Sequence, residues 1–227
     1  MNPHPKPGTK GFTLVELLVV IAIVAVLALL GFIGSSRFIE NGRKVQTLAQ
    51  FRDLQVGMGL FVNDYTKPPI PASKEYDGDD TVYGDPPTPY YHNGFLVAVL
   101  VGESKEFSSS TTGEIFDVSQ VNKLKESYIQ LPFKKDKKGG VGPDGNLYDP
   151  WGSEIIVAVN GFAGEGKTLV ASNKGKSDRL LYTYGLGEYK ETKPREQAYV
   201  FWTYGKDGKK GTGGAGNYKG SDDVISW

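Results

Sequence analysis

The sequence Gly11-Phe12-Thr13-Leu14-Val15-Glu16, followed by an apolar run from Leu17 to Leu30, organises this chain. From Leu14 to Ile33 only Glu16 is charged. A helix rises about 1.5 Å per residue, so roughly 20 such residues match a hydrocarbon core of about 30 Å. We therefore expect the stretch to enter a membrane or an equally dry environment.

Glu16 is the residue in this segment that needs an explanation. Burying an unpaired carboxylate in such surroundings costs at least a few kcal/mol, even on lenient insertion scales. The sequence therefore predicts that the Glu16 carboxylate has a partner.

The composition limits the possible function classes. With 227 residues and 39% hydrophobic residues, the chain can form one modest domain besides the apolar segment. Its formal net charge is zero and no basic stripe recurs, which argues against nucleic acid as the main partner. Cysteine is absent, so packing or a metal must supply any cross-link. The 30 glycines and 13 tyrosines favour a loop-rich domain that contains β-strands.

The residues before the apolar run carry positive charge at Lys6 and Lys10. Such residues hold their end of a membrane segment in the cytoplasm and send the other end across. Two processing points stay open. One is a weak signal-peptide site among Gly31, Gly34, Ser35 and Ser36, and the other is Gly11, before the apolar run.

The segment Lys10-Gly11-Phe12-Thr13-Leu14-Val15-Glu16-Leu17-Leu18-Val19-Val20 resembles the prepilin signature of type IV pilins and type II secretion pseudopilins. The resemblance implies that a dedicated prepilin peptidase cleaves after Gly11 and methylates the new terminus at Phe12. It also implies that Glu16 pairs with the N-terminal amine of a neighbouring subunit. The alternative is a plain single-pass anchor in which these residues occur by chance.

The implied cleavage offers Glu16 the partner that it needs. A new α-amine near the carboxylate at low dielectric turns an isolated charge into an ion pair. A pair shared between subunits also fixes their axial register, because a slipped neighbour leaves both charges unmatched.

A second apolar pattern follows the first. Phe38, Val45, Leu48, Phe51, Leu54, Met58, Phe61 and Tyr65 recur at helical spacings. This predicts an amphipathic helix face buried on a globular domain, with a free coiled coil as the alternative. Lys67-Pro68-Pro69 ends the helix. We expect one continuous helix from about Phe12 to Thr66.

The rest of the chain predicts a small antiparallel sheet lying on this helix, an α+β fold of type IV pilin-like form. The expected strands are Ile155 to Val159, Arg179 to Tyr184 and Ala198 to Tyr204. Gly94 to Gly102 is expected to be a short buried helix or strand that Asn93 could cap, and Val118 to Leu131 a helix ended by Pro132. The expected loops and turns are Pro68 to Tyr91, Glu103 to Thr112, the basic run Lys134 to Gly140, and Pro143 to Asn146.

Three patterns resemble functional sites but favour simpler interpretations. Asp77-Gly78-Asp79-Asp80 lacks the alternating ligands of a calcium loop and is expected to be a solvated turn. Gly161 to Thr168 has the spacing of a phosphate-binding loop, but too short a segment follows for the required helix, so we expect a glycine hairpin. His92 has no triad or zinc pattern around it and is expected at the surface. No enzyme constellation appears, although dispersed catalytic carboxylates stay open.

The C-terminal segment is rich in glycine and flanked by acids. It runs from Tyr204-Gly205-Lys206-Asp207-Gly208 through Gly213, Gly214 and Gly216 to Ser221-Asp222-Asp223. It has little apolar surface with which to hold itself in place. A calcium ion, which takes six to eight oxygen ligands, could join the two ends.

This region and Asp149-Pro150-Trp151-Gly152 resemble the major pseudopilin of type II secretion. The resemblance implies a calcium site of Asp207, the acidic pair Asp222 and Asp223, and the carbonyl of Tyr204. The final residues Ser221-Asp222-Asp223 depart from the Asp-x-Asp pattern of that family, and Ser221 is the candidate to replace one acid. The alternative is a glycine tail with solvated aspartates. The chain also exceeds the usual pseudopilin length around Pro69 to Thr112 and Ser172 to Arg195.

The resulting prediction has three parts: a leader at 1–11, a transmembrane and polymerisation helix at 12–36, and a periplasmic pilin-like domain at 37–227. The resemblance implies a non-enzymatic subunit of a periplasmic type II secretion pseudopilus, single-pass in the bacterial inner membrane before assembly. Its partners would be further copies, the prepilin peptidase, the inner-membrane assembly platform and minor pseudopilins. The alternatives are a type IV pilus subunit for adhesion, motility or DNA uptake, and a membrane-anchored binding or enzymatic domain that does not polymerise.

Overall fold

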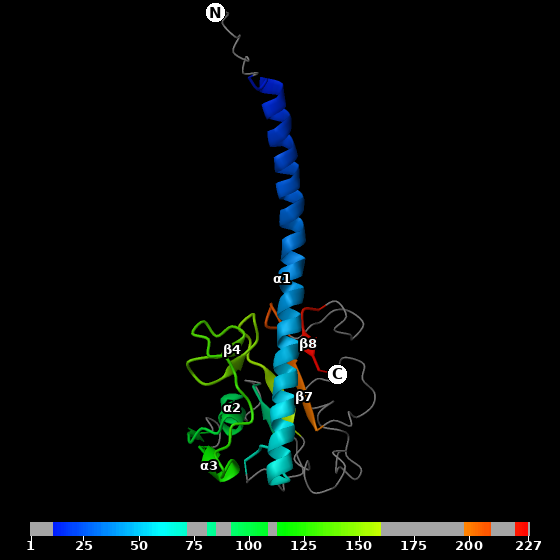
Figure 1. Ribbon diagram of the computed structural model, residues 1–227. Helices are drawn as coiled ribbons and strands as arrows, with labels where there is room; N and C mark the ends of the chain where they lie inside the picture. Colours follow the sequence, from blue (N-terminus) through cyan, green and yellow to red (C-terminus); the bar gives the residue numbers. More distant parts are fainter. Residues whose placement is uncertain are drawn as a thin grey trace, which may run out of the picture. The chain divides into compact units, whose positions relative to one another are not determined.

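The computed structural model describes residues 11–71, 81–84, 92–108, 113–159, 198–209 and 221–226, with the backbone alone at 30–37 (Figure 1). The chain divides into two compact units, Met1–Gly42 and Arg43–Trp227. We call them the N-terminal and the C-terminal unit and describe each by itself.

One helix, α1, runs over Leu14–Tyr65, close to the bounds expected from the sequence. Gly31 and Gly34 do not interrupt it. Beyond Tyr65, Thr66 takes a positive φ of 55° and prolines follow, so the helix ends where the Lys-Pro-Pro sequence predicts. The predicted continuous helix is confirmed.

The C-terminal unit contains a four-stranded sheet with the order β1-β6-β7-β8, antiparallel throughout. Its strands are β1 (Thr81–Tyr83), β6 (Ile156–Val159), β7 (Tyr199–Thr203) and β8 (Val224–Ile225). The α+β class and the strands predicted around β6 and β7 are confirmed. The loop predicted over Pro68 to Tyr91 is wrong in part, because β1 lies within it.

The main core joins the second half of α1 to this sheet. Phe51, Leu54, Met58 and Phe61 lie in one buried cluster with residues from β6, β7 and α2. The rings of Phe51 and Phe201 stack with their centroids 5.7 Å apart. The predicted amphipathic face of the helix is therefore buried on the domain from Phe51 to Phe61, and its apolar surface stabilises both elements. The prediction is wrong for Phe38, Val45 and Leu48, whose side chains are exposed.

A short helix, α2 (Gly94–Val101), is buried in the same core. It ends at Gly102, which adopts a left-handed conformation with φ 77°. A Cβ at this position would come within 2.6 Å of the Lys125 carbonyl oxygen, so glycine is needed for both reasons. The segment predicted as helix or strand is a helix.

Two pairs of short strands lie outside the four-stranded sheet. β2 (Glu106–Ser108) pairs with β3 (Ile115–Asp117), so the prediction of a loop over Glu103 to Thr112 is wrong in part. β4 (Gly140–Val141) pairs with β5 (Leu147–Tyr148) around the predicted turn, where Gly145 has φ 85°. The predictions for Asp77 to Asp80, Gly161 to Thr168 and Arg179 to Tyr184 lie outside the described residues.

The helix predicted from Val118 to Leu131 is wrong, because α3 covers only Val118–Val121. Asp117 caps it by accepting a hydrogen bond from the Ser119 N–H at 2.8 Å. The Asn122 side chain then donates to the carbonyls of Val99 and Glu126, at 2.7 and 2.8 Å. These bonds hold the chain in an irregular path that the apolar spacing alone did not reveal.

Candidate functional site

Thr13 and Glu16 cap the N-terminus of α1. The Thr13 N–H and hydroxyl both donate to Glu16 Oε2, at 2.9 and 2.8 Å, and the Glu16 N–H donates to Thr13 Oγ1 at 3.3 Å. This reciprocal arrangement is a capping box, which satisfies backbone donors that a helix N-terminus leaves without partners. Glu16 thus has a partner within its own chain.

Sequence reasoning missed Thr13. The signal was present as Thr-x-x-Glu directly before the apolar run. The capping box turns the Glu16 carboxylate back toward the residue that follows Phe12. Both hydrogen bonds from Thr13 to the carboxylate end on Oε2. Pairing between Glu16 and a neighbouring subunit, and processing at Gly11 and Phe12, stay predictions.

The side chains around and after Glu16 on this helix expose an unusual amount of apolar surface. Twelve of them are 48–81% exposed: Leu14, Val15, Leu17, Leu18, Val19, Val20, Ile21, Ile23, Val24, Val26, Leu27 and Leu29. Apolar patches of this extent mark surfaces that contact a membrane or another protein.

Among the residues that the structure describes, no helix is both long and apolar enough to cross a bilayer. The transmembrane part of the prediction is therefore not confirmed.

The C-terminal loop has its two flanks in contact. The Asp207 N–H donates to Asp222 Oδ2 at 2.8 Å, and Asp207 Oδ1 accepts from the Lys209 N–H at 2.8 Å. On the second flank the Asp223 N–H donates to Ser221 Oγ at 3.2 Å. The backbone of Asp207 and the carboxylate of Asp222, two residues of the predicted calcium set, thus meet across the loop.

These flanks supply oxygen atoms of the kind that calcium prefers. Asp207 is exposed, Asp222 is half-buried and Asp223 is buried. Among the residues whose positions are given, however, no group of three or more acidic or histidine side chains is arranged to hold a metal ion. The carbonyl of Tyr204, the residue between β7 and Gly205, completes the set implied by resemblance. The calcium site stays a prediction.

The Asp-Pro-Trp-Gly sequence forms a buried turn that supports this loop. Asp149 Oδ1 accepts from the N–H groups of Trp151, Gly152 and Ser153, at 2.9, 2.8 and 2.9 Å. Its Oδ2 accepts from the Thr203 hydroxyl on β7. Burial raises the pKa of Asp149, while these hydrogen bonds act in the opposite direction. Ser153 then donates to the Gly205 carbonyl at 3.3 Å, which connects the turn to the loop.

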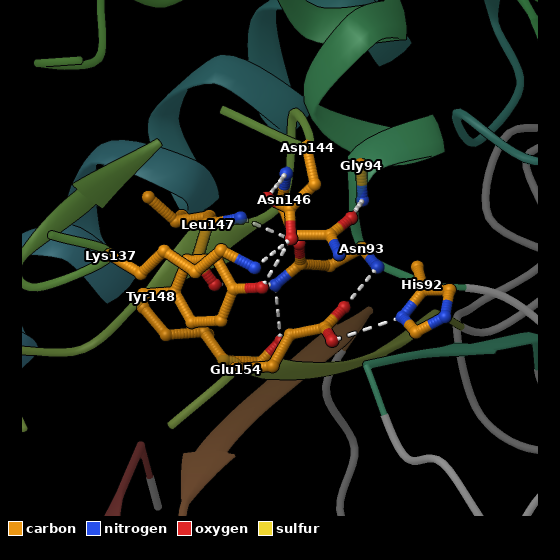
Figure 2. A network of polar contacts seen from close by, with 10 residues as sticks. His92, Asn93, Gly94, Lys137, Asp144, Asn146, Leu147, Tyr148 and Glu154 are labelled. Atoms are coloured by element: carbon orange, nitrogen blue, oxygen red, sulfur yellow. Dashed lines mark hydrogen bonds and ion pairs between the residues drawn. The ribbon is translucent and has the colours of Figure 1, made fainter. Parts of the chain in front are cut away.

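A second buried network surrounds Asn93 (Figure 2). Its Nδ2 donates to the carbonyls of Leu147 and Ile155, at 2.8 and 2.7 Å, and its Oδ1 accepts from the Leu147 N–H at 2.7 Å. The prediction that Asn93 caps α2 is wrong, because its side chain makes no capping bond. It connects the start of α2 to β5 and to Ile155, the residue directly before β6, instead.

His92 lies beside this network without forming a catalytic group. Its side chain is 69% exposed, as expected for a surface residue, and its Nδ1 lies 3.1 Å from Glu154 Oε2. Glu154 also accepts from the Asn93 N–H at 2.7 Å. This contact positions the start of α2 and brings no nucleophile with it.

The predicted basic turn is confirmed over Lys134 to Lys138, which are exposed, whereas Gly139 and Gly140 are buried and Gly140 begins β4. Lys137 Nζ lies 2.6 Å from Asp144 Oδ2, and the Tyr148 hydroxyl donates to the same oxygen at 2.7 Å. Burial alone would raise the pKa of Asp144, but hydrogen bonds from Lys137, Tyr148 and the Asn146 N–H outweigh it and lower the pKa to about 2.

Replacing Asp144 with Asn is therefore expected to cost stability in a pH-dependent way. Because the folded-state pKa lies below the ordinary value of 3.8, the carboxylate stabilises the fold above about pH 4 and loses this contribution as the pH falls toward 2. After allowance for solvent screening, we expect a loss of about 1 kcal/mol at pH 7. Chemical unfolding of both proteins between pH 2 and 7 measures it.

Asp136→Asn is the matched control, because Asp136 is an exposed acid in the turn before β4, next to Lys137. Its unfolding free energy should change by less than about 0.5 kcal/mol. A deficit in Asp144→Asn that stays constant down to pH 2 would contradict the role given to Asp144.

Comparison with known proteins supports the N-terminal part of this description. Residues 6–32 match the family model of the prokaryotic N-terminal methylation motif. The chain therefore carries a type IV pilin-like prepilin signature, which supports a structural filament subunit. Searches of curated proteins and of solved structures found no match.

Proposed function

We propose that the chain is a structural subunit of the periplasmic pseudopilus of a type II secretion system. The observation that carries this proposal is the methylation motif at residues 6–32, which leads into a helix with exposed apolar side chains. The pilin-like α+β fold of the rest supports it. The resemblance of the Asp-Pro-Trp-Gly turn and the C-terminal loop to the major pseudopilin favours secretion over a pilus.

In this proposal the precursor enters the inner membrane, and the prepilin peptidase removes residues 1–11 and methylates Phe12. The assembly platform then moves the subunit from the bilayer into the filament, where helix contacts replace lipid contacts. The new α-amine of one copy pairs with Glu16 of the next. The periplasmic domain forms the surface of the fibre, and minor pseudopilins join the same assembly.

Mass analysis of the mature chain tests the processing step. We expect a protein that begins at Phe12 and carries one additional methyl group on its amine. A mature protein that retains Met1, or that begins at any residue other than Phe12, would refute the scheme. An unmethylated terminus at Phe12 would limit the processing to cleavage.

A type IV pilus subunit is the second candidate, because the methylation motif is shared by both machines. The genes beside this one distinguish the two. A secretin and secreted cargo proteins would favour secretion, whereas a retraction ATPase would favour a pilus. A membrane-anchored domain that never polymerises is the third candidate, and recovery of fibres containing this chain would exclude it.

We further propose that calcium binds Asp207, Asp222 and Asp223, with Ser221 and the Tyr204 carbonyl as additional ligands. A ligand at 100 times its dissociation constant stabilises a fold by about 2.7 kcal/mol. Chelation should therefore lower the melting temperature of the full chain in detergent by roughly 5–10 °C. Thermal unfolding followed by near-UV circular dichroism measures this change.

The double variant Asp207→Asn, Asp222→Asn is the control for that experiment. It should melt at the lower temperature with or without chelator. A wild-type chain that melts at the same temperature in calcium and in chelator would refute the metal site and leave the filament proposal intact.

A further inference from the structure

The C-terminal unit carries exposed lysines on two turns. Lys134, Lys135 and Lys138 lie on the turn before β4, and Lys209 lies on the turn after β7. We call these four residues the basic collar. Their ammonium groups form no ion pair with any other residue in the described part of the chain. By contrast, Lys137 in the same turn is held by Asp144.

Both turns lie at the end of the unit where α1 enters it. A Cβ at Gly139 would come within 2.5 Å of the Gln46 side-chain nitrogen, and Gln46 follows closely on the first residue of the unit, Arg43. A Cβ at Gly152 would lie 3.8 Å from Lys138 side-chain carbons. The neighbouring Ser153 donates to Gly205, which leads into the second turn. Figure 1 shows β4 near this end of the unit and α3 toward the other.

An exposed aromatic side chain accompanies the lysines. Phe133 directly precedes Lys134 and is 61% exposed. The acidic groups nearby are largely occupied, because Asp144 holds Lys137 and Asp207 accepts from the Lys209 N–H. Asp136 is the exposed acid within the first turn. The formal charge of the whole chain is zero, so this basic end is a local excess of positive charge.

We propose that this end of the C-terminal unit docks on an anionic lipid surface, with the basic collar at the headgroups and Phe133 at their level. Basic residues beside a membrane segment bind anionic lipids, and aromatic rings are enriched at the same depth. The inference rests on the proposed membrane anchor. Because the apolar helix precedes Arg43 in the same chain, it would supply the lipid surface at high effective concentration. A free nucleic acid has no such advantage.

Docking would keep the C-terminal unit in contact with the lipid headgroups before the subunit joins a filament. Each lysine near an anionic surface contributes about 1 kcal/mol, or roughly a fivefold factor in the ratio of docked to undocked units. Loss of two lysines should lower that ratio roughly 25-fold.

The absence of cysteine permits a direct test with the full chain in lipid vesicles. The variant Phe133→Cys carries an apolar fluorophore in place of the phenyl ring. The reference variant is Leu124→Cys, because the Leu124 side chain is 62% exposed. We expect spin-labelled lipids to quench the label at 133 in phosphatidylglycerol vesicles and not in phosphatidylcholine vesicles. The label at 124 should not be quenched in either, and high salt should abolish the effect at 133.

The matched variants are Lys134→Gln, Lys135→Gln and the control Lys123→Gln, Lys125→Gln, which removes the same charge from exposed positions after α3. The first pair should remove the quenching and the second should not. Equal quenching in both lipids, or equal loss in both variants, would overturn the proposal. So would binding of duplex DNA that depends on Lys134 and Lys135 without any lipid effect.

Flotation of the vesicles separates this inference from the proposed function. A chain that does not float with the lipid lacks the membrane anchor, and the proposed function then fails. A chain that floats but shows no quenching at 133 leaves the anchor intact and refutes the docking surface alone.

Discussion

Chains in which Glu16 is replaced by alanine are expected to reach the membrane but to form no fibres. The substitution makes the helix more apolar, so entry into the bilayer is retained. It removes the carboxylate that the proposal pairs with the amine of an adjoining copy, and leaves that amine without a counter-charge in a dry interface. Carbonate extraction measures membrane insertion, and electron microscopy of sheared fractions measures fibres.

Thr13→Ala is the control that separates the capping hydrogen bonds of Glu16 from its proposed ion pair with the amine of an adjoining copy. It removes the capping hydroxyl, at a cost of about 1 kcal/mol to the helix start, but keeps the carboxylate. Fibres should therefore still form. Normal fibres from Glu16→Ala would contradict the proposed pairing. Loss of fibres in Thr13→Ala would instead assign the requirement to the capping box.

The second large effect is expected at Gly57, on the buried side of α1. A Cβ there would overlap with Ile129 Cγ2, and Ile129 is only 8% exposed. Overpacking of a filled core costs typically 1–3 kcal/mol, and a branched side chain cannot rotate out of the way. Gly57→Val should therefore lower the melting temperature by roughly 5–10 °C, measured by circular dichroism in detergent.

Gly59 offers a control two residues along the same helix. No atom lies within 4 Å of a Cβ placed there. Alanine is favoured over glycine in a helix by about 1 kcal/mol, so Gly59→Ala should raise stability slightly. The two substitutions are thus expected to have opposite signs. Equal stability of Gly57→Val and the wild type would show that Ile129 does not pack as described.

The long helix and the sheet could be predicted because their signals are periodic and strong. The apolar spacing from Phe51 to Phe61 describes one face of a helix, and that face is the one buried on the domain. The strands β6 and β7 are short runs of apolar and aromatic residues between turn sequences. Each of these elements is specified by a local pattern that agrees with its surroundings.

The errors arose where a polar side chain determines the path of the backbone. Asn122 binds carbonyls from two segments and ends α3, although the apolar spacing continues beyond it. Asn93 stands where a cap is expected, but its side-chain amide donates to the carbonyls of Leu147 in β5 and Ile155 instead. Such long-range partners are invisible in a single sequence, because they depend on the folded arrangement.

The candidate site was predictable only in part. Gly11, Phe12 and Glu16 follow from a short, distinctive sequence, and the match at residues 6–32 supports that sequence. The residues flanking the C-terminal loop were predicted by resemblance, and the structure brings Asp207 and Asp222 together. Whether a metal joins them depends on oxygen geometry that sequence spacing does not fix.

The capping box at the start of α1 also affects how accessible the Gly11–Phe12 bond is to a peptidase. Because the helix begins at Leu14, the Gly11–Phe12 peptide bond lies outside its turns. Proteolysis requires a substrate backbone that can lie open across the catalytic groups. Cleavage of this bond would therefore require no unwinding of the helix. All of α1 could stay helical while the leader is released.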